Sequence, residues 1–140
     1  MSASDDYAET MNASRDGWCT AMGLRFVRVT VDEVTAELTI GDAHKQAYGI
    51  VHGGVHCGII ETLASVGAAL NALADGRSAV GLENHTSFLA AVREGKLVGR
   101  AVPIARGKRS QVWEATVTSG EGKLVAKGTV RVICLEQRAG

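Results

Sequence analysis

Apolar residues recur at helical spacing through one long segment in the middle of the chain. The large ones lie three or four positions apart, at Ile59, Leu63, Val66, Leu70 and Leu73. Alanine and glycine fill many of the positions between them, so neither side of the segment is plainly polar. A helix that is apolar nearly all round has to be buried. The pattern therefore predicts a helix of roughly 30 Å, starting near Gly53, that is enclosed by other elements.

The segments on both sides of this helix alternate between apolar and polar residues, as half-buried strands do. Before it, residues 24–30 and 34–40 read as two strands of a hairpin, with Asp32 and Glu33 in the turn. After it, strand character returns in residues 79–89, 96–106, 110–118 and 123–135. Glycine-containing turns separate these later segments, and we expect them to form a four-stranded meander.

Pro103 indicates an edge or a bulge in its strand, because proline cannot donate to a sheet ladder. Neither face of residues 96–106 is plainly polar, which hints at oligomerisation. The order of elements places the protein in the α+β class, with a six-stranded antiparallel sheet wrapped around one long helix.

The N-terminal residues 5–21 are weakly helical, and Ser4 is a candidate N-cap. We expect one short helix that docks on the body through Tyr7, Met11 and Trp18. With 140 residues and 46% hydrophobic content, the chain suits a single domain over residues 1–140, of which 1–21 form this helical segment.

Composition excludes several classes of protein. Fifteen basic and fifteen acidic residues cancel, so no global field would recruit nucleic acid or an anionic membrane. Three scattered cysteines predict neither a disulfide framework nor a CxxC zinc site. The N-terminus lacks the layout of a signal peptide, and no apolar run approaches the length of a membrane span. We therefore expect a soluble, cytoplasmic protein.

Glu61 is the single carboxylate of the predicted helix. A carboxylate buried without a partner is costly, so its presence there needs a reason. It could act as a nucleophile or a general base. Alternatively, it bonds to a neighbouring backbone or serine group, or lies on an exposed edge of the helix. Ser65, one turn further along the same face, could hold the carboxylate or a water molecule.

The glycines Gly53 and Gly54 allow a tight turn where the helix begins. The first N–H groups of a helix have no partner within it, and the helix dipole is positive there, so this end can stabilise an oxyanion. His52 could donate a hydrogen bond at this place or simply cap the turn. His56 follows four residues later, but the zinc-protease signature requires glutamate directly after the first histidine. Cys57 has no base marked by the sequence and is expected to be structural.

A second cluster of polar residues lies in a predicted turn between strands. Arg106, Lys108 and Arg109 surround Gly107, and Ser110 follows. Three cations and a glycine backbone could bind phosphate, although surface solubility also explains such runs.

The stretch from Gln46 to Leu70 resembles the hotdog-fold acyl-CoA thioesterases, in which a sheet wraps one long helix. The likeness extends to VGLENHTSFLAAVREGKLVG and GKRSQVWEATVTSGEGKLVA, and it is greatest to the PaaI-like subgroup that contains 4-hydroxybenzoyl-CoA and 1,4-dihydroxy-2-naphthoyl-CoA thioesterases. That subgroup has a glutamine six residues before a His-Gly-Gly turn, a glutamate nine residues after the histidine, and a serine or threonine four further on. Here these places hold Gln46, His52, Gly53, Gly54, Glu61 and Ser65. Residues 84–89 depart from the subgroup's pattern.

The resemblance implies a role for each of these residues. The Gly53 N–H would polarise the thioester carbonyl, with Gln46 orienting it and His52 assisting the departing thiolate. Glu61 would attack the carbonyl or activate water, and Ser65 would position Glu61 or that water. The turn residues Arg106, Lys108, Arg109 and Ser110, together with Gly54, would contact the CoA ester.

The resemblance further implies a homodimer with sites between the subunits, often paired into a homotetramer, and no metal or other cofactor. The expected activity is hydrolysis of an aromatic or bulky acyl-CoA. A non-catalytic acyl-CoA-binding module and a hydratase of the same fold remain alternatives. A serine esterase is disfavoured because the chain has no GxSxG motif.

Overall fold

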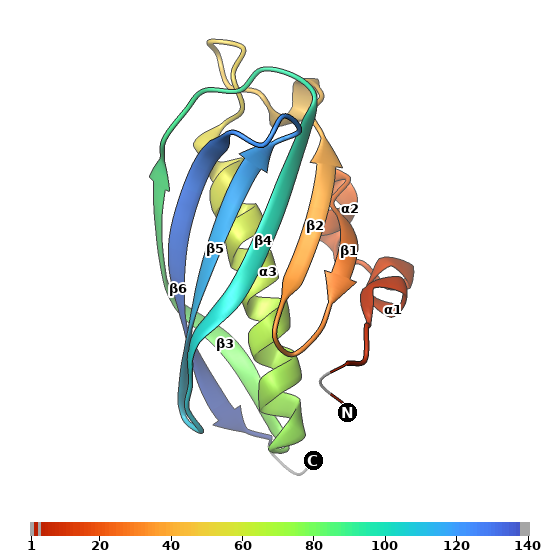
Figure 1. The fold of residues 1–140 in the computed structure, drawn as a ribbon, viewed down its shortest axis with the longest axis vertical. Helices are drawn as coiled ribbons and strands as arrows, with labels where there is room; N and C mark the ends of the chain where they lie inside the picture. Colours follow the sequence, from red (N-terminus) through yellow and green to blue (C-terminus); the bar gives the residue numbers. More distant parts are fainter. Residues whose placement is uncertain (1, 3, 138–140) are drawn as a thin grey trace.

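A computed structural model describes residue 2 and residues 4–137. In chain order its elements are α1 (Ala8–Ala13), α2 (Gly17–Met22), β1 (Arg25–Val29), β2 (Val34–Thr39), the short 3-10 helix η1 (Asp42–His44), α3 (Gly53–Ala74), β3 (Arg77–Phe88), β4 (Lys96–Arg106), β5 (Ser110–Ser119) and β6 (Leu124–Glu136). The strands form one antiparallel sheet of six that curls around α3 (Figure 1). The predicted hotdog architecture is confirmed.

The strand order is β1-β2-β4-β5-β6-β3. The expected four-stranded meander is therefore wrong in one respect: only β4, β5 and β6 follow one another as neighbours. After α3 the chain returns along the far edge, where β3 pairs with β6. Residues 89–95 then connect this edge to β4, which lies inside the sheet and pairs with β2 and β5. Pro103 lies where the β4–β5 register shifts, so the prediction of a bulge at this proline is confirmed.

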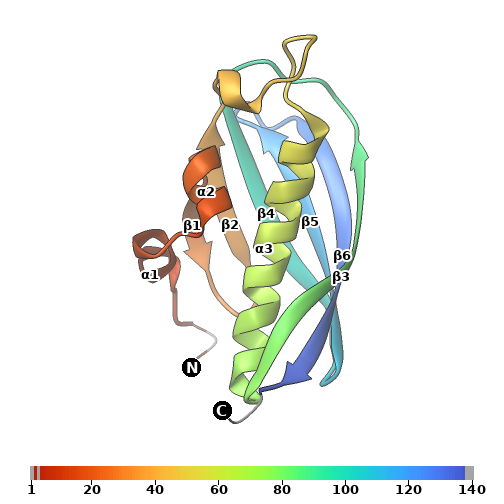
Figure 2. The ribbon, with the colours of Figure 1, turned by 180° about the vertical axis from the view of Figure 1, so that it is seen from behind.

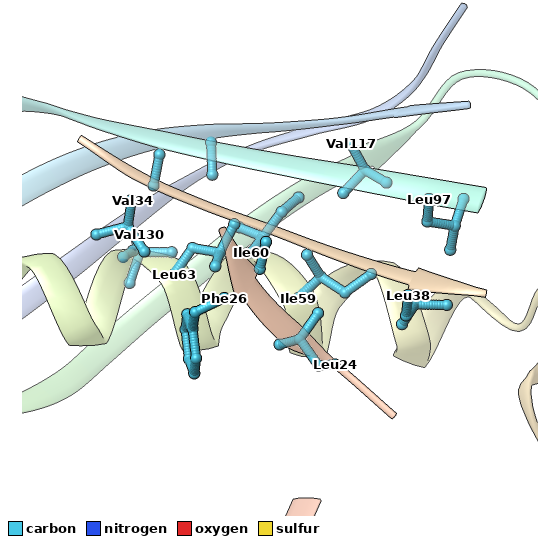
Figure 3. Packing of buried hydrophobic residues seen from close by; sticks show 14 of the residues in the cluster. Leu24, Phe26, Val34, Leu38, Ile59, Ile60, Leu63, Leu97, Val117 and Val130 are labelled. Atoms are coloured by element: carbon cyan, nitrogen blue, oxygen red, sulfur yellow. The ribbon is translucent and has the colours of Figure 1, made fainter. Parts of the chain in front are cut away.

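The core fills the space between α3 and the concave face of the sheet (Figure 3). Ile59, Ile60 and Leu63 on the helix are at most 1% exposed. Trp113 on β5 is fully buried and lies so close to Gly67 of α3 that no Cβ would fit between them. The small residues of α3 thus let the helix approach the sheet closely.

The N-terminal segment forms two short helices in place of the expected one. Asp16 adopts an extended conformation and its side chain accepts a hydrogen bond from the Cys19 N–H at 2.7 Å, so it ends the first segment and caps α2. Ser4 caps neither helix; the N-cap of α1 is Tyr7, without a side-chain bond. The Trp18 ring packs against Gly58 of α3, which docks α2 on the body.

The expectation that no apolar segment approaches the length of a membrane span is wrong. By length and composition alone, the 22-residue α3 is long and apolar enough to cross a membrane. In this fold α3 is instead the central helix around which the sheet curls. Its outer face remains uncovered by the sheet along much of its length (Figure 2).

Candidate active site

His52 caps the N-terminus of α3. Its Nδ1 accepts a hydrogen bond from the Gly54 N–H at 2.8 Å. This bond requires a lone pair on Nδ1, so the neutral ring carries its proton on Nε2. The Gly53 N–H, in contrast, donates to none of the described residues. The helix therefore begins with one N–H satisfied by its cap and one available to an oxyanion.

Gln46 lies beside this helix end, and one of the two polar atoms of its side chain forms a hydrogen bond within the described residues. Its Oε1 accepts from the Tyr48 N–H, which leaves the amide Nε2 free to donate. Arg93 stabilises the loop that contains Gln46 and Tyr48 by donating a hydrogen bond to the Tyr48 carbonyl at 2.9 Å. Gln46 and Gly53 line the same cavity, of about 450 Å³. One cavity is thus lined by two residues that each have an unpaired donor.

The Glu61 carboxylate is held by side chains on both sides. Ser65 donates from Oγ to Glu61 Oε1 at 3.3 Å, and Asn84 of β3 donates from Nδ2 to Oε2 at 3.1 Å. Asn84 also donates to the Cys57 carbonyl at 3.2 Å, and accepts from Thr86 Oγ1 at 2.6 Å. The bond to Ser65 agrees with the sequence, which places Ser65 one turn along the helix from Glu61. The sequence does not predict the bonds of Asn84 to α3. It indicates only that Asn84 and Thr86, two residues apart, share one face of a strand.

A β-bulge makes room for this carboxylate. The pairing of β3 with β6 shifts between Gly81 and Glu83, so that Leu82 has no partner in the register. A Cβ at Gly81 would collide with Glu61 Oε1. The bulge and the missing side chain together let β3 pass close to Glu61 and present Asn84 to it.

The chain does not bring all the predicted site residues together. Glu61 and Ser65 line a second cavity, of about 590 Å³, whose other walls are mostly apolar. Gly53 and Gln46 do not line it. Gly53 and Glu61 are eight residues apart on α3, a rise of about 12 Å. One chain therefore holds these residues in two groups, each facing its own cavity.

The basic turn lies at the other end of α3. Arg106 pairs with Asp32 at 2.6 Å and donates to the Val31 carbonyl at 3.1 Å, so its charge is largely engaged by the β1–β2 turn. Lys108 and Arg109 are exposed, and no ion pair of either is found among the described residues. The Gly107 N–H donates to the Ser110 carbonyl at 3.0 Å and closes the turn.

His56 and Cys57 occupy different surroundings from His52. His56 is 3% exposed and lines the cavity of Gln46 and Gly53. Cys57 is half-buried, with its carbonyl bonded to Asn84. Within residues 2 and 4–137, no group of three or more His, Cys, Asp or Glu side chains is placed to hold a metal ion.

The sequence profile of the thioesterase superfamily matches residues 48–126, from the loop before α3 into β6, and the chain belongs to this family. It is 40% identical over 119 residues to a proposed esterase of Mycobacterium tuberculosis, Rv1847, covering 84% of this chain and 85% of that protein. The Rv1847 structure superposes with a TM-score of 0.86 at 36% identity, covering 89% of this chain and all of the other. The Haemophilus influenzae thioesterase HI1161 superposes with a TM-score of 0.85 at 28% identity, covering 92% and 90% of the two chains.

Proposed function

We propose that this protein hydrolyses the thioester of an aromatic or otherwise bulky acyl-CoA, releasing a carboxylic acid and free CoA, as in the PaaI-like subgroup. The observation that carries the proposal is the Glu61 carboxylate, which two side-chain donors hold at the edge of a mostly apolar cavity. Membership of the thioesterase superfamily supports the same reaction class. A non-catalytic acyl-CoA-binding module would have no use for so constrained a carboxylate.

In the proposed reaction, the thioester carbonyl accepts hydrogen bonds from the Gly53 N–H and from Gln46 Nε2. These donors and the helix dipole stabilise the negative charge that develops on the oxygen. Glu61 attacks the carbonyl carbon or takes a proton from an attacking water. The thiolate then leaves, and the Nε2 proton of His52 can stabilise it. After direct attack the acyl group remains on Glu61 as a mixed anhydride, which water hydrolyses to the free acid and the regenerated carboxylate. Ser65 keeps Glu61 in place throughout.

We propose that the two groups are half-sites contributed by two subunits, because they lie about 12 Å apart along one helix and face different cavities. β3 is a 12-residue edge strand with exposed Val80, Leu82 and Phe88, each at least 50% accessible. A long apolar edge of this kind pairs readily with another chain. Antiparallel pairing of two β3 strands about a two-fold axis would set the two α3 helices antiparallel, which can bring Glu61 of one subunit towards Gly53 of the other. We propose this dimer as the active unit, with pairs of dimers forming a tetramer.

Lys108 and Arg109, with Ser110, are proposed to contact the CoA phosphates. Arg106 also donates to Asn71 near the C-terminus of α3, at 3.4 Å, so the turn lies at that end of the helix. Asn71 is 18 residues from Gly53, or about 27 Å along the axis. A CoA ester bound at Gly53 would therefore meet the basic turn of another subunit more easily than that of its own.

Glu61→Gln tests the proposed function. The amide keeps the shape and hydrogen-bonding reach of the side chain but loses its basicity and charge. Thiol release from benzoyl-CoA, 1,4-dihydroxy-2-naphthoyl-CoA and fatty acyl-CoAs should be measurable with the wild type. On the best substrate, kcat should fall by about 10² to 10⁴-fold in the variant, the usual contribution of a general base. Tight binding of acyl-CoA without turnover by the wild type would favour the binding module instead.

A further inference from the structure

His56 has a ring nitrogen, Nδ1, with no hydrogen-bond partner among the described residues. The residue is 3% exposed, and its Nδ1 is buried. A buried polar group left unpaired is rare in proteins and lowers their stability. The proposed chemistry at Gly53 and Glu61 does not use this ring.

The ring lines the cavity that begins at the oxyanion donors. Besides Gln46, Gly53 and His56, that cavity of about 450 Å³ is walled by apolar side chains: Ile50, Val51, Phe88, Leu89, Ala90 and Ala91. The His56 and Phe88 rings are tilted at 39° with centroids 6.3 Å apart. None of the described lining residues carries a charge that would hold His56 protonated.

Burial keeps the imidazole neutral, since desolvation lowers the pKa of His56 below its usual value. A neutral imidazole offers one N–H donor and one nitrogen acceptor. It therefore suits an uncharged hydroxyl and disfavours a carboxylate or an ammonium group, neither of which would find a counter-charge in this cavity.

We propose that this cavity binds the acyl part of the substrate and that His56 is a specificity-determining residue that hydrogen-bonds an uncharged hydroxyl on that acyl group. This inference rests on the proposed function, because it takes the thioester carbonyl to lie at Gly53. The pantetheine arm fits the cavity less well. It carries several amide groups that need several partners, whereas the cavity offers one unpaired ring beyond the Gly53 and Gln46 donors that the thioester carbonyl would occupy.

The test compares acyl groups that differ only by a hydroxyl: 4-hydroxybenzoyl-CoA with benzoyl-CoA, and 3-hydroxybutyryl-CoA with butyryl-CoA. In wild type, kcat/KM should favour the hydroxylated member of at least one pair. His56→Phe should reduce that preference, the ratio of the two kcat/KM values, about tenfold, the effect of losing one buried hydrogen bond. His56→Gln, which keeps a donor and an acceptor, should restore part of the preference. His85→Phe, a histidine replacement outside this cavity, should leave it unchanged.

Two results would overturn the inference. One is an unchanged preference in His56→Phe. The other is an equal rise in KM for every ester, which would assign the cavity to the pantetheine arm. His56→Leu provides a second replacement without nitrogen if the larger phenylalanine ring unfolds the protein, as thermal unfolding would show.

A measurement without turnover separates this inference from the proposed function. Phenol should perturb the ¹⁵N signals of the His56 ring in labelled wild type, and toluene, which has the same shape, should not. If no acyl-CoA is hydrolysed but phenol binds in this way, the proposed reaction fails and the hydroxyl-binding cavity stands. If esters are hydrolysed but neither the preference nor the His56 signals respond, the cavity assignment alone fails.

Discussion

The two proposed half-sites on α3 differ in how many of their polar groups form hydrogen bonds within the chain. Around Glu61, both carboxylate oxygens accept hydrogen bonds, and the Asn84 donor is itself fixed by Thr86. Around Gly53, the backbone N–H, Gln46 Nε2 and His56 Nδ1 lack partners among the described residues. The carboxylate is thus held in one orientation by the chain itself, whereas the donors of the other group are free to bind a ligand, which in the proposed reaction is the substrate.

Removing the free N–H should have the largest effect on this contrast. Gly53 is the first residue of α3, where proline is well tolerated, and His52 before it has the extended conformation that a following proline requires. Gly53→Pro should lower kcat about 10² to 10³-fold, the cost of losing one oxyanion donor. Gly53→Ala is the matched control. Its Cβ makes the same approach to the Phe88 ring, 2.9 Å in the present geometry, but the N–H remains.

The same variant shows whether the half-sites meet between subunits. Gly53→Pro and Glu61→Gln proteins should each be nearly inactive, and heterodimers formed by unfolding and refolding them together should each contain one intact site. Random pairing restores activity to about a quarter of the wild-type level. Failure to regain activity, with heterodimers demonstrated by mass spectrometry, would mean that Gly53 and Glu61 of one chain act together.

Asn84→Ala should weaken the satisfied half-site. Losing a hydrogen bond to a charged group typically costs about 1.5 to 3 kcal/mol, so kcat should fall by at least about tenfold. KM should be unchanged, because Asn84 contacts Glu61 and not the substrate. Thr86→Val removes only the bond that fixes Asn84 and should have a smaller effect in steady-state kinetics. A rise in KM with kcat preserved would show that Asn84 binds substrate and does not position Glu61.

The difference between the two half-sites also indicates which features of the fold and the site can be predicted from the sequence. Local patterns were sufficient for the central helix, the strands and the glycine turn, since each depends on neighbouring residues. They were insufficient for Asn84, which meets Glu61 from 23 residues away only because β3 is bulged and crosses to pair with β6. The strand order was missed for the same reason. The break at Asp16 has a local cause, since Asp16 is an N-cap residue, but the weak helical pattern of residues 5–21 does not show it.

The basic turn should contribute less, because its cations are exposed. Lys108→Ala combined with Arg109→Ala should raise KM for acyl-CoA about fivefold, in keeping with the small energies of exposed ion pairs, and added salt should shrink the difference. KM for the matching pantetheine thioester should not change. Lys123→Ala, an exposed lysine in the β5–β6 turn, is the charge control. Equal effects on both thioesters would remove the turn from CoA binding.

The unpaired His56 should leave the smallest trace, in the pH dependence of stability. Burial lowers its pKa in the folded state, so the unfolded chain binds a proton more readily and acid favours unfolding. The resulting loss of stability begins near pH 6.5, the usual histidine pKa, and steepens below it towards at most about 1.4 kcal/mol per pH unit.

Urea unfolding of wild type and His56→Phe from pH 8 to pH 5 isolates this contribution, because all other titrating groups are shared. The difference in unfolding free energy should be constant above pH 7, and below it the wild type should lose stability faster. If the difference in unfolding free energy were the same at every pH, the folded protein would accommodate a protonated His56. The half-site at Gly53 would then not contain a buried neutral imidazole.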